Sequence, residues 1–144
     1  MQAPTPGGAA EGAEPPSTRA TARAILVIDD NAQLRALLGG ALAKMGYAVT
    51  SASDGGEAFE AIARQKFDVV ITDLLMPEKD GIEVIGELRK KQPEARIIAM
   101  SGGGRGSRDH YLSTAKGLGA HALLGKPFSV SELNAALESV SPRP

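Results

Sequence analysis

Five polar side chains follow four short apolar segments, at the points where the strands of a parallel sheet would end. They are Asp29 and Asp30 after residues 24–28, Asp73 after residues 67–72, Ser101 after residues 96–100, and Lys126 after residues 121–125. Because parallel strands end at the same edge of their sheet, these groups are expected to meet there. Three clustered carboxylates repel one another unless a hard cation lies among them. The set therefore predicts a Mg²⁺ site in which one aspartate accepts a phosphoryl group.

Each member of this set has a role that suits its chemistry. Asp73 is the predicted nucleophile, because an aspartate carboxylate can take a phosphoryl group as an acyl phosphate. Asp29 and Asp30 are the predicted metal carboxylates, since Mg²⁺ binds one or two carboxylates directly and keeps several waters. Ser101 would donate its hydroxyl to a phosphoryl oxygen, and Lys126 would hold a compact positive charge against another.

Plainer interpretations exist for each of these residues taken alone. Asp29 or Asp30 could cap the helix that begins near Asn31, although a cap does not need two acids. A lone serine or lysine is usually a turn residue or a solvated side chain. The Lys126–Pro127 bond, however, is a candidate cis peptide, which would turn the ammonium group towards the acids.

The composition limits the classes of protein that the chain can belong to. Its 144 residues suit one domain, and its formal charge of -1 gives no broad basic surface for nucleic acid or an anionic membrane. The absence of cysteine excludes disulfides, thiolate zinc sites and a cysteine nucleophile. No apolar stretch is long enough to span a bilayer.

The first 22 residues differ from the rest of the chain. They are rich in proline, glycine and alanine and hold no large aliphatic side chain after Met1. Such a composition buries too little surface to fold, so a flexible tail over 1–22 and one folded domain over 23–144 are expected. The tail lacks the apolar core of a secretory signal, which favours a cytoplasmic location. No second folded domain is expected after the last helix.

Strand-like and helix-like segments alternate from Ala24 onward. Strands are expected at about 24–29, 47–51, 67–72, 96–100 and 121–125, and helices at about 33–45, 57–63 with Asp54 as N-cap, 82–88, 108–117, and from Ser129 or Ser131 to Val140. This alternation implies right-handed βαβ units, and hence a doubly wound α/β domain with a five-stranded parallel sheet and five helices. In the loop after Asp73, Gly81 is expected to permit close backbone approach.

Four segments in this order resemble the receiver domains of bacterial two-component response regulators: VIDDN, VITDLLMPEKDG, MSGG and GKPF, over about residues 24–140. The resemblance implies a flavodoxin-like sheet of strand order 2-1-3-4-5. It implies that Asp73 takes its phosphoryl group from a sensor histidine kinase or a histidine phosphotransfer protein. It also implies direct Mg²⁺ binding by Asp30 and Asp73, binding through water by Asp29, and a further ligand in the Leu75 carbonyl. The serine and lysine named above would contact the phosphoryl group.

Three features depart from the usual pattern of such domains. Leu123 stands where they commonly carry a Tyr or Phe that rotates as a switch, the stretch between Ser101 and Lys126 is longer and glycine-rich, and no DNA-binding output domain is expected. The chain therefore resembles stand-alone receivers, which bind an effector protein or pass phosphate onward, and no direct DNA or membrane binding is expected. Leu75 and Gly103 offer no side-chain group that could position a water molecule for attack on phosphorylated Asp73, so slow hydrolysis of that acyl phosphate is expected.

Other classes of function stay open at this point. A Mg²⁺-dependent phosphatase with an aspartate nucleophile would need a second acid two residues later, where this chain has Leu75. A nucleotide-binding module could use the glycine-rich residues 101–107, although these lack the lysine pattern of a phosphate-binding loop. A receiver that binds its partner without phosphorylation is a third alternative. The favoured interpretation is a switch that catalyses only its own phosphoryl transfer and slow autodephosphorylation.

Overall fold

The computed structural model describes residues 23–74, 81–102, 116–117 and 119–140. Within these residues the chain forms five strands and four helices. They are β1 (Ala24–Ile28), α2 (Ala32–Lys44), β2 (Ala48–Ala52), α3 (Gly55–Arg64), β3 (Val69–Asp73), α4 (Gly81–Lys91), β4 (Arg96–Ser101), β5 (Ala122–Gly125) and α6 (Val130–Val140). The predicted tail and most of the fourth predicted helix, 108–117, lie outside the described residues and stay predictions.

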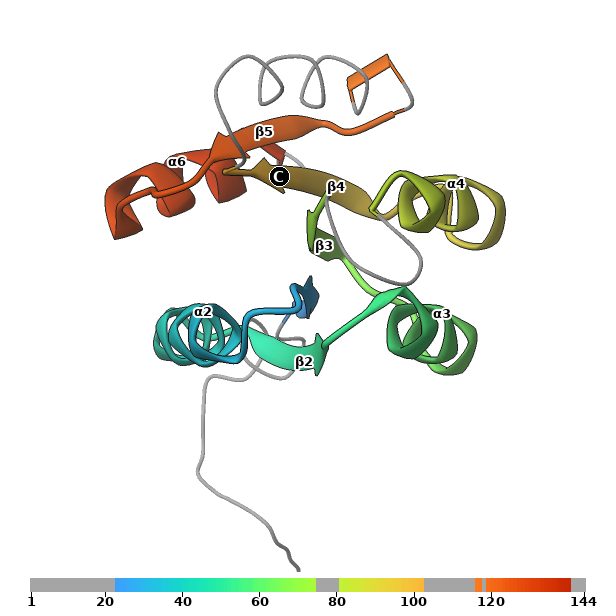
Figure 1. Ribbon diagram of the computed structural model, residues 1–144, viewed down its shortest axis with the longest axis horizontal. Helices are drawn as coiled ribbons and strands as arrows, with labels where there is room; N and C mark the ends of the chain where they lie inside the picture. The colour runs from blue at the N-terminus through green and yellow to red at the C-terminus, as the bar shows by residue number, and fades with distance from the viewer. Residues whose placement is uncertain (1–22, 75–80, 103–115, 118, 141–144) are drawn as a thin grey trace, which may run out of the picture.

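The strands form one parallel sheet in the order β2-β1-β3-β4-β5, as predicted (Figure 1). The central strands β3 and β4 are rich in Val and Ile and are buried almost along their whole length, as expected of strands covered on both faces. The edge strands β2 and β5 have partly exposed residues instead. The doubly wound α/β fold predicted from the sequence is thereby confirmed.

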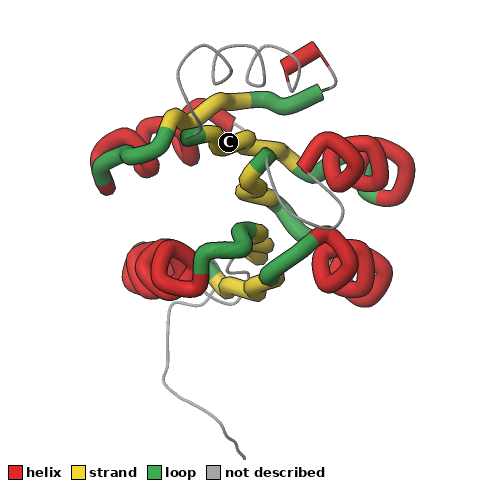
Figure 2. The backbone as a smooth tube through the Cα atoms, in the orientation of Figure 1, coloured by secondary structure: helices red, strands yellow, loops and turns green. Residues whose placement is uncertain are grey.

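The four helices of the described residues cover the sheet on both faces, two on each side. Helices α2 and α6 lie on one face, and α3 and α4 lie on the other (Figure 2). Alternate residues of each strand supply the two cores, so Val27 and Ile71 face α2 and α6, whereas Leu26 and Val70 face α3 and α4.

Local capping residues decide where the helices begin. The Asn31 side chain accepts from the Leu34 N–H and is the N-cap of α2, so neither Asp29 nor Asp30 is that cap. Asp54 caps α3, as predicted. Of the two serines considered for α6, Ser129 has the capping contact, accepting from the Glu132 N–H at 3.0 Å.

A membrane-spanning helix is not found in the described part of the chain, where no helix is both long and apolar enough. The cytoplasmic location expected from the sequence stays a prediction.

Candidate functional site

The register of the sheet brings the polar strand ends to one level. Ile28 of β1 pairs with Thr72 of β3, which places Asp29 beside Asp73 in the sheet. On the other side of β3, Asp73 pairs with Met100, the residue before Ser101. Ser101 in turn pairs with Gly125, and the Lys126 N–H donates to its carbonyl at 2.9 Å. The sheet topology alone therefore gathers the predicted residues at its carboxyl edge.

Three carboxylates form the acidic part of the site. Asp29, Asp30 and Asp73 each offer an oxygen, and these oxygens all lie within 4.8 Å of one another. Asp29 is fully buried, Asp73 is 6% exposed and Asp30 is exposed. One acid is thus fixed in the protein interior, and another is open to solvent at the mouth of the site.

The Lys126 ammonium lies between two of these acids. Its Nζ donates to Asp29 Oδ2 at 2.7 Å and lies 3.4 Å from Asp73 Oδ2. Burial acts to lower the pKa of Lys126, but the hydrogen bond that it donates to Asp29 and the charge of Asp73 outweigh this effect, so the net pKa is raised. The ammonium therefore stays charged at neutral pH. The Lys126–Pro127 peptide bond is cis.

Asp29 is held by hydrogen bonds on all four of its polar groups. Its N–H donates to the Ala52 carbonyl at 3.2 Å, and its Oδ1 accepts from the Asn31 N–H at 2.8 Å. Its Oδ2 accepts from Lys126, and its own carbonyl accepts from Arg35 Nη1 at 2.9 Å. A buried carboxylate is costly unless it is paired in this way. The acid nearest the interior is consequently rigid.

Ser101 carries a hydroxyl that is short of partners. Its side chain is buried, and its Oγ has no hydrogen-bond partner within the described part of the chain. Buried hydroxyls normally have one, because leaving one unpaired costs free energy. The hydroxyl is therefore able to donate to an oxygen atom that enters the site.

Two neighbours of Asp73 fix its backbone. The Thr72 hydroxyl donates to the Asp73 carbonyl at 3.0 Å. On the other side, the α-carbon of Gly81 packs so close that an added Cβ would lie 2.1 Å from that carbonyl oxygen. The expected close backbone approach at Gly81 is confirmed, and it places the first turn of α4 against the end of β3.

Three further residues singled out in the sequence do not lie among the acids described above or lie outside the described residues. Leu75, the expected carbonyl ligand, lies outside the described residues, as do Gly103 and the loop that follows it. Leu123 is half-buried on β5 and packs on the core beneath α3 and α4.

Sequence reasoning missed the two side chains that hold the site through backbone carbonyls, Arg35 and Thr72. A hydrogen bond to a carbonyl has no motif, since every residue carries that acceptor. Arg35 had one usable signal, its position in the first turns of a helix. Long helical side chains lean towards the helix N-terminus, and here that direction leads to the acids.

The donor set fits a hard divalent cation. Carboxylate oxygens are what Mg²⁺ and Ca²⁺ bind, and three within reach of one another supply more than one direct ligand. One of them is exposed, so an ion could keep the waters that Mg²⁺ retains. The residues present therefore fit a divalent metal ion.

Comparison with known proteins gives one family. The model of the response regulator receiver domain matches residues 25–138. Response regulator MprA of Mycobacterium leprae is 36% identical over 118 residues, which make up 81% of this chain and 50% of that protein. The chain thus spans about half the length of the curated relatives it matches.

Solved structures agree with this assignment. A response regulator of Burkholderia pseudomallei, with a phosphorylated aspartic acid, a calcium ion and citrate, is 33% identical with a TM-score of 0.72, over 80% of this chain and 66% of that one. TrrA of Thermotoga maritima, in complex with Mg²⁺ and BeF, is 33% identical with a TM-score of 0.72, over 83% of this chain and 99% of that one. By its fold, its strand-end residues and these matches, the chain belongs to the response regulator receiver domain family.

Proposed function

We propose that this chain is a phospho-accepting signalling switch and that Asp73 is its acceptor. The observation that carries the proposal is the position of the Lys126 ammonium, which bridges Asp29 at 2.7 Å and Asp73 at 3.4 Å. An ammonium group at this position can move towards Asp73 when phosphorylation increases the negative charge of that side chain. The buried, unpaired hydroxyl of Ser101 supplies a second donor on the neighbouring strand.

The proposed reaction transfers a phosphoryl group from a phosphohistidine to Asp73. A carboxylate oxygen of Asp73 forms the new bond to phosphorus, the phosphorus–nitrogen bond breaks, and its electron pair stays on the imidazole nitrogen. Bound Mg²⁺, held by Asp29, Asp30 and Asp73, would supply positive charge against the phosphoryl oxygens. Lys126 neutralises charge on the other side, and Thr72 with Gly81 keeps the acceptor backbone in place.

The same groups explain how modification could be detected elsewhere in the protein. Phosphorylation adds about -1.5 to -2 charges and three acceptor oxygens at Asp73. Lys126 gains a stronger partner than Asp29, and Ser101 gains an acceptor. Both side chains stand at strand ends next to the surface formed by β4 and β5, so their shift changes that surface. Leu123 on β5 would form part of an apolar contact for an effector.

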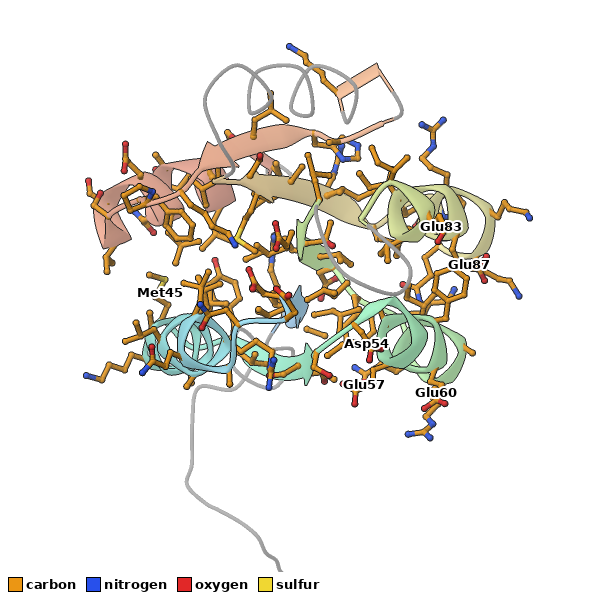
Figure 3. The ribbon with its side chains drawn as sticks, viewed as in Figure 1. Met45, Asp54, Glu57, Glu60, Glu83 and Glu87 are labelled. Carbon is orange, nitrogen blue, oxygen red and sulfur yellow. The ribbon has the colours of Figure 1, made fainter. Side chains whose placement is uncertain are left out.

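The proposed phospho-donor is a histidine on a sensor histidine kinase or a histidine phosphotransfer protein. A depression of ≈ 660 Å³ opens beside Asp73 and is bordered by Leu34, Leu37 and Phe128. It continues into an apolar groove between α2 and α6 that shares these three residues. Leu37 is 71% exposed. Met45, the C-cap residue of α2, also lines this groove, and its side chain is labelled in Figure 3. An apolar helical surface carrying the histidine would be well suited to this groove.

The output is proposed to be a protein contact or onward phosphotransfer, without direct DNA binding or turnover of other substrates. The glycine-rich residues after Gly102, on which a nucleotide-binding alternative would depend, lie outside the described residues. The phosphatase alternative would need an acid where Leu75 stands. Hydrolysis of added p-nitrophenyl phosphate should therefore stay at the level of a buffer blank.

The proposal is tested by intact mass after incubation with acetyl phosphate and Mg²⁺. The wild type should gain one phosphoryl adduct that hydroxylamine removes, as expected of an acyl phosphate. Asp73→Asn should gain none, and Glu60→Gln, which removes an exposed acid of α3, should behave as the wild type. If the wild type binds Mg²⁺ by calorimetry yet forms no adduct, the proposal is wrong and a phosphorylation-independent binding module replaces it.

A further inference from the structure

Arg35 is tied to the acidic site without touching any of its carboxylates. It lies in the first turns of α2, and its Nη1 donates to the backbone carbonyl of Asp29 at 2.9 Å in a partly buried contact. That carbonyl belongs to the peptide unit that joins Asp29 to Asp30. The guanidinium therefore holds the turn from which both acidic side chains project.

The two acids differ in how firmly the rest of the protein holds them. The Asp29 side chain is fixed by Asn31 and Lys126, as well as by burial. Asp30 is exposed, and its side chain makes no hydrogen bond within the described residues. Its direction depends on the peptide plane before it, which is the plane that the Arg35 hydrogen bond fixes. Rotation of that peptide would carry the Asp30 carboxylate away from Asp29 and Asp73.

We propose that Arg35 is a positioning residue, which keeps the Asp29–Asp30 peptide in the orientation that aims Asp30 at the metal. This inference rests on the proposed function, because it concerns the same Mg²⁺ site. It adds a residue that the acidic motif does not contain. Residues that orient metal ligands through hydrogen bonds typically change metal affinity by about tenfold or more when they are lost.

The positive charge of Arg35 acts against Mg²⁺ binding, whereas its positioning role favours Mg²⁺ binding. A guanidinium near three carboxylates lowers the local negative potential and thereby opposes binding of a divalent cation. If charge were its only influence, removing Arg35 would tighten Mg²⁺ binding. If positioning dominates, removing it weakens Mg²⁺ binding. The two explanations predict changes of opposite sign.

The test measures Mg²⁺ affinity by isothermal titration calorimetry on the full chain, for wild type, Arg35→Ala and Arg35→Lys. Lysine keeps the positive charge but lacks the planar fork that reaches a carbonyl from this position. Both variants should bind Mg²⁺ about tenfold more weakly than the wild type. Lys44→Ala is the matched control, because it removes one exposed positive charge from the last turn of the same helix. Its affinity should equal that of the wild type.

Circular dichroism in EDTA identifies which variants are folded before titration, and the affinity comparison uses folded protein only. Arg35→Lys, the milder change, keeps the test decisive if Arg35→Ala is unstable. Unchanged or tighter binding by the folded variants would overturn the inference while leaving Asp73 phosphorylation intact. Absence of Mg²⁺ binding by the wild type would overturn both the inference and the metal site of the proposed function.

Discussion

Replacing Gly81 by alanine should damage the site through the backbone of Asp73, the proposed phospho-acceptor. The added Cβ would lie 2.1 Å from the Asp73 carbonyl oxygen and 2.8 Å from the Leu74 α-carbon. Contacts of a Cβ shorter than 3.0 Å essentially do not occur, so one partner must move by about 0.9 Å or more. Both partners are backbone atoms, which cannot rotate away as the tip of a flexible side chain can.

The hydrogen bonds of the sheet determine whether the end of β3 or the start of α4 moves. Asp73 pairs with Met100, and the Leu74 N–H donates to the Met100 carbonyl at 3.0 Å, so the end of β3 is anchored. The start of α4 must then move, and with it the Gly81 N–H bond to the Leu74 carbonyl at 3.1 Å. Overpacking of this kind costs about 1–3 kcal/mol, and a clash with backbone belongs at the upper end.

The matched control is Gly86→Ala in the same helix. A Cβ at Gly86 would meet nothing within 4 Å, and the residue is exposed. Alanine there should stabilise the protein by about 1 kcal/mol, because glycine is a poor helix former. Urea unfolding followed by circular dichroism should thus shift in opposite directions for the two variants. Phosphorylation by acetyl phosphate should fall only in Gly81→Ala. Equal stability and equal phosphorylation of both variants would refute this account of the β3–α4 junction.

Four further perturbations test separate parts of the structure. The buried Gln92 amide bonds to one carbonyl in α3, to one at the C-terminal end of that helix, and to the Phe67 N–H. Gln92→Leu removes the partner of all three groups and should lower the free energy of unfolding, measured in urea, by about 3 kcal/mol. Burial and the charges of Arg96 and Arg89 lower the pKa of His121, whose Nδ1 accepts from Ile97. The free energy of unfolding should therefore fall as pH drops below the ordinary value of 6.5, and His121→Gln should flatten that fall. Asp30→Asn should raise the metal-free melting temperature by relieving repulsion, and should lose the further rise on adding Mg²⁺. Ser101→Ala should leave unphosphorylated stability unchanged or higher while weakening any phosphorylation-dependent partner affinity; unchanged affinity for the phosphorylated form would contradict its role.

The site was largely predictable from the sequence because its geometry follows from topology. Once the strands are parallel, the residue after each strand must lie at one edge, so Asp29, Asp73 and Lys126 meet with no further information. The strand limits also followed from apolar runs, although Asp73 and Ser101 proved to be the last residues of their strands instead of following them. A ladder hydrogen bond can continue through a polar residue, so an apolar pattern ends earlier than the strand does.

The contacts that the sequence did not predict join a side chain to a distant or local carbonyl. Gln92 reaches the Ile62 carbonyl from 30 residues away, and Arg35 reaches that of Asp29. Neither a glutamine just after a helix nor an arginine within one indicates such a partner, because the acceptor is present in every residue. A cap role at α2 was the plainer alternative for Asp29 or Asp30, whereas the favoured interpretation made both of them metal carboxylates. Asn31 takes that role, which leaves both carboxylates of the pair for the site.

In the proposed phospho-accepting switch, the Ser101 hydroxyl contributes a free-energy cost to the unphosphorylated state. Its hydroxyl is buried and lacks a partner within the described residues, and an unpaired buried hydroxyl costs about 1–3 kcal/mol. An acceptor oxygen on Asp73, one strand away, would remove that cost. Since about 1.4 kcal/mol is a tenfold change in an equilibrium, this one bond could shift the conformational balance by about 5- to 150-fold. Lys126 acts differently, because it already has Asp29 as a partner and so exchanges one anion for a stronger one instead of pairing an unpaired group. The serine therefore carries more of the difference between the two states than the charged lysine does.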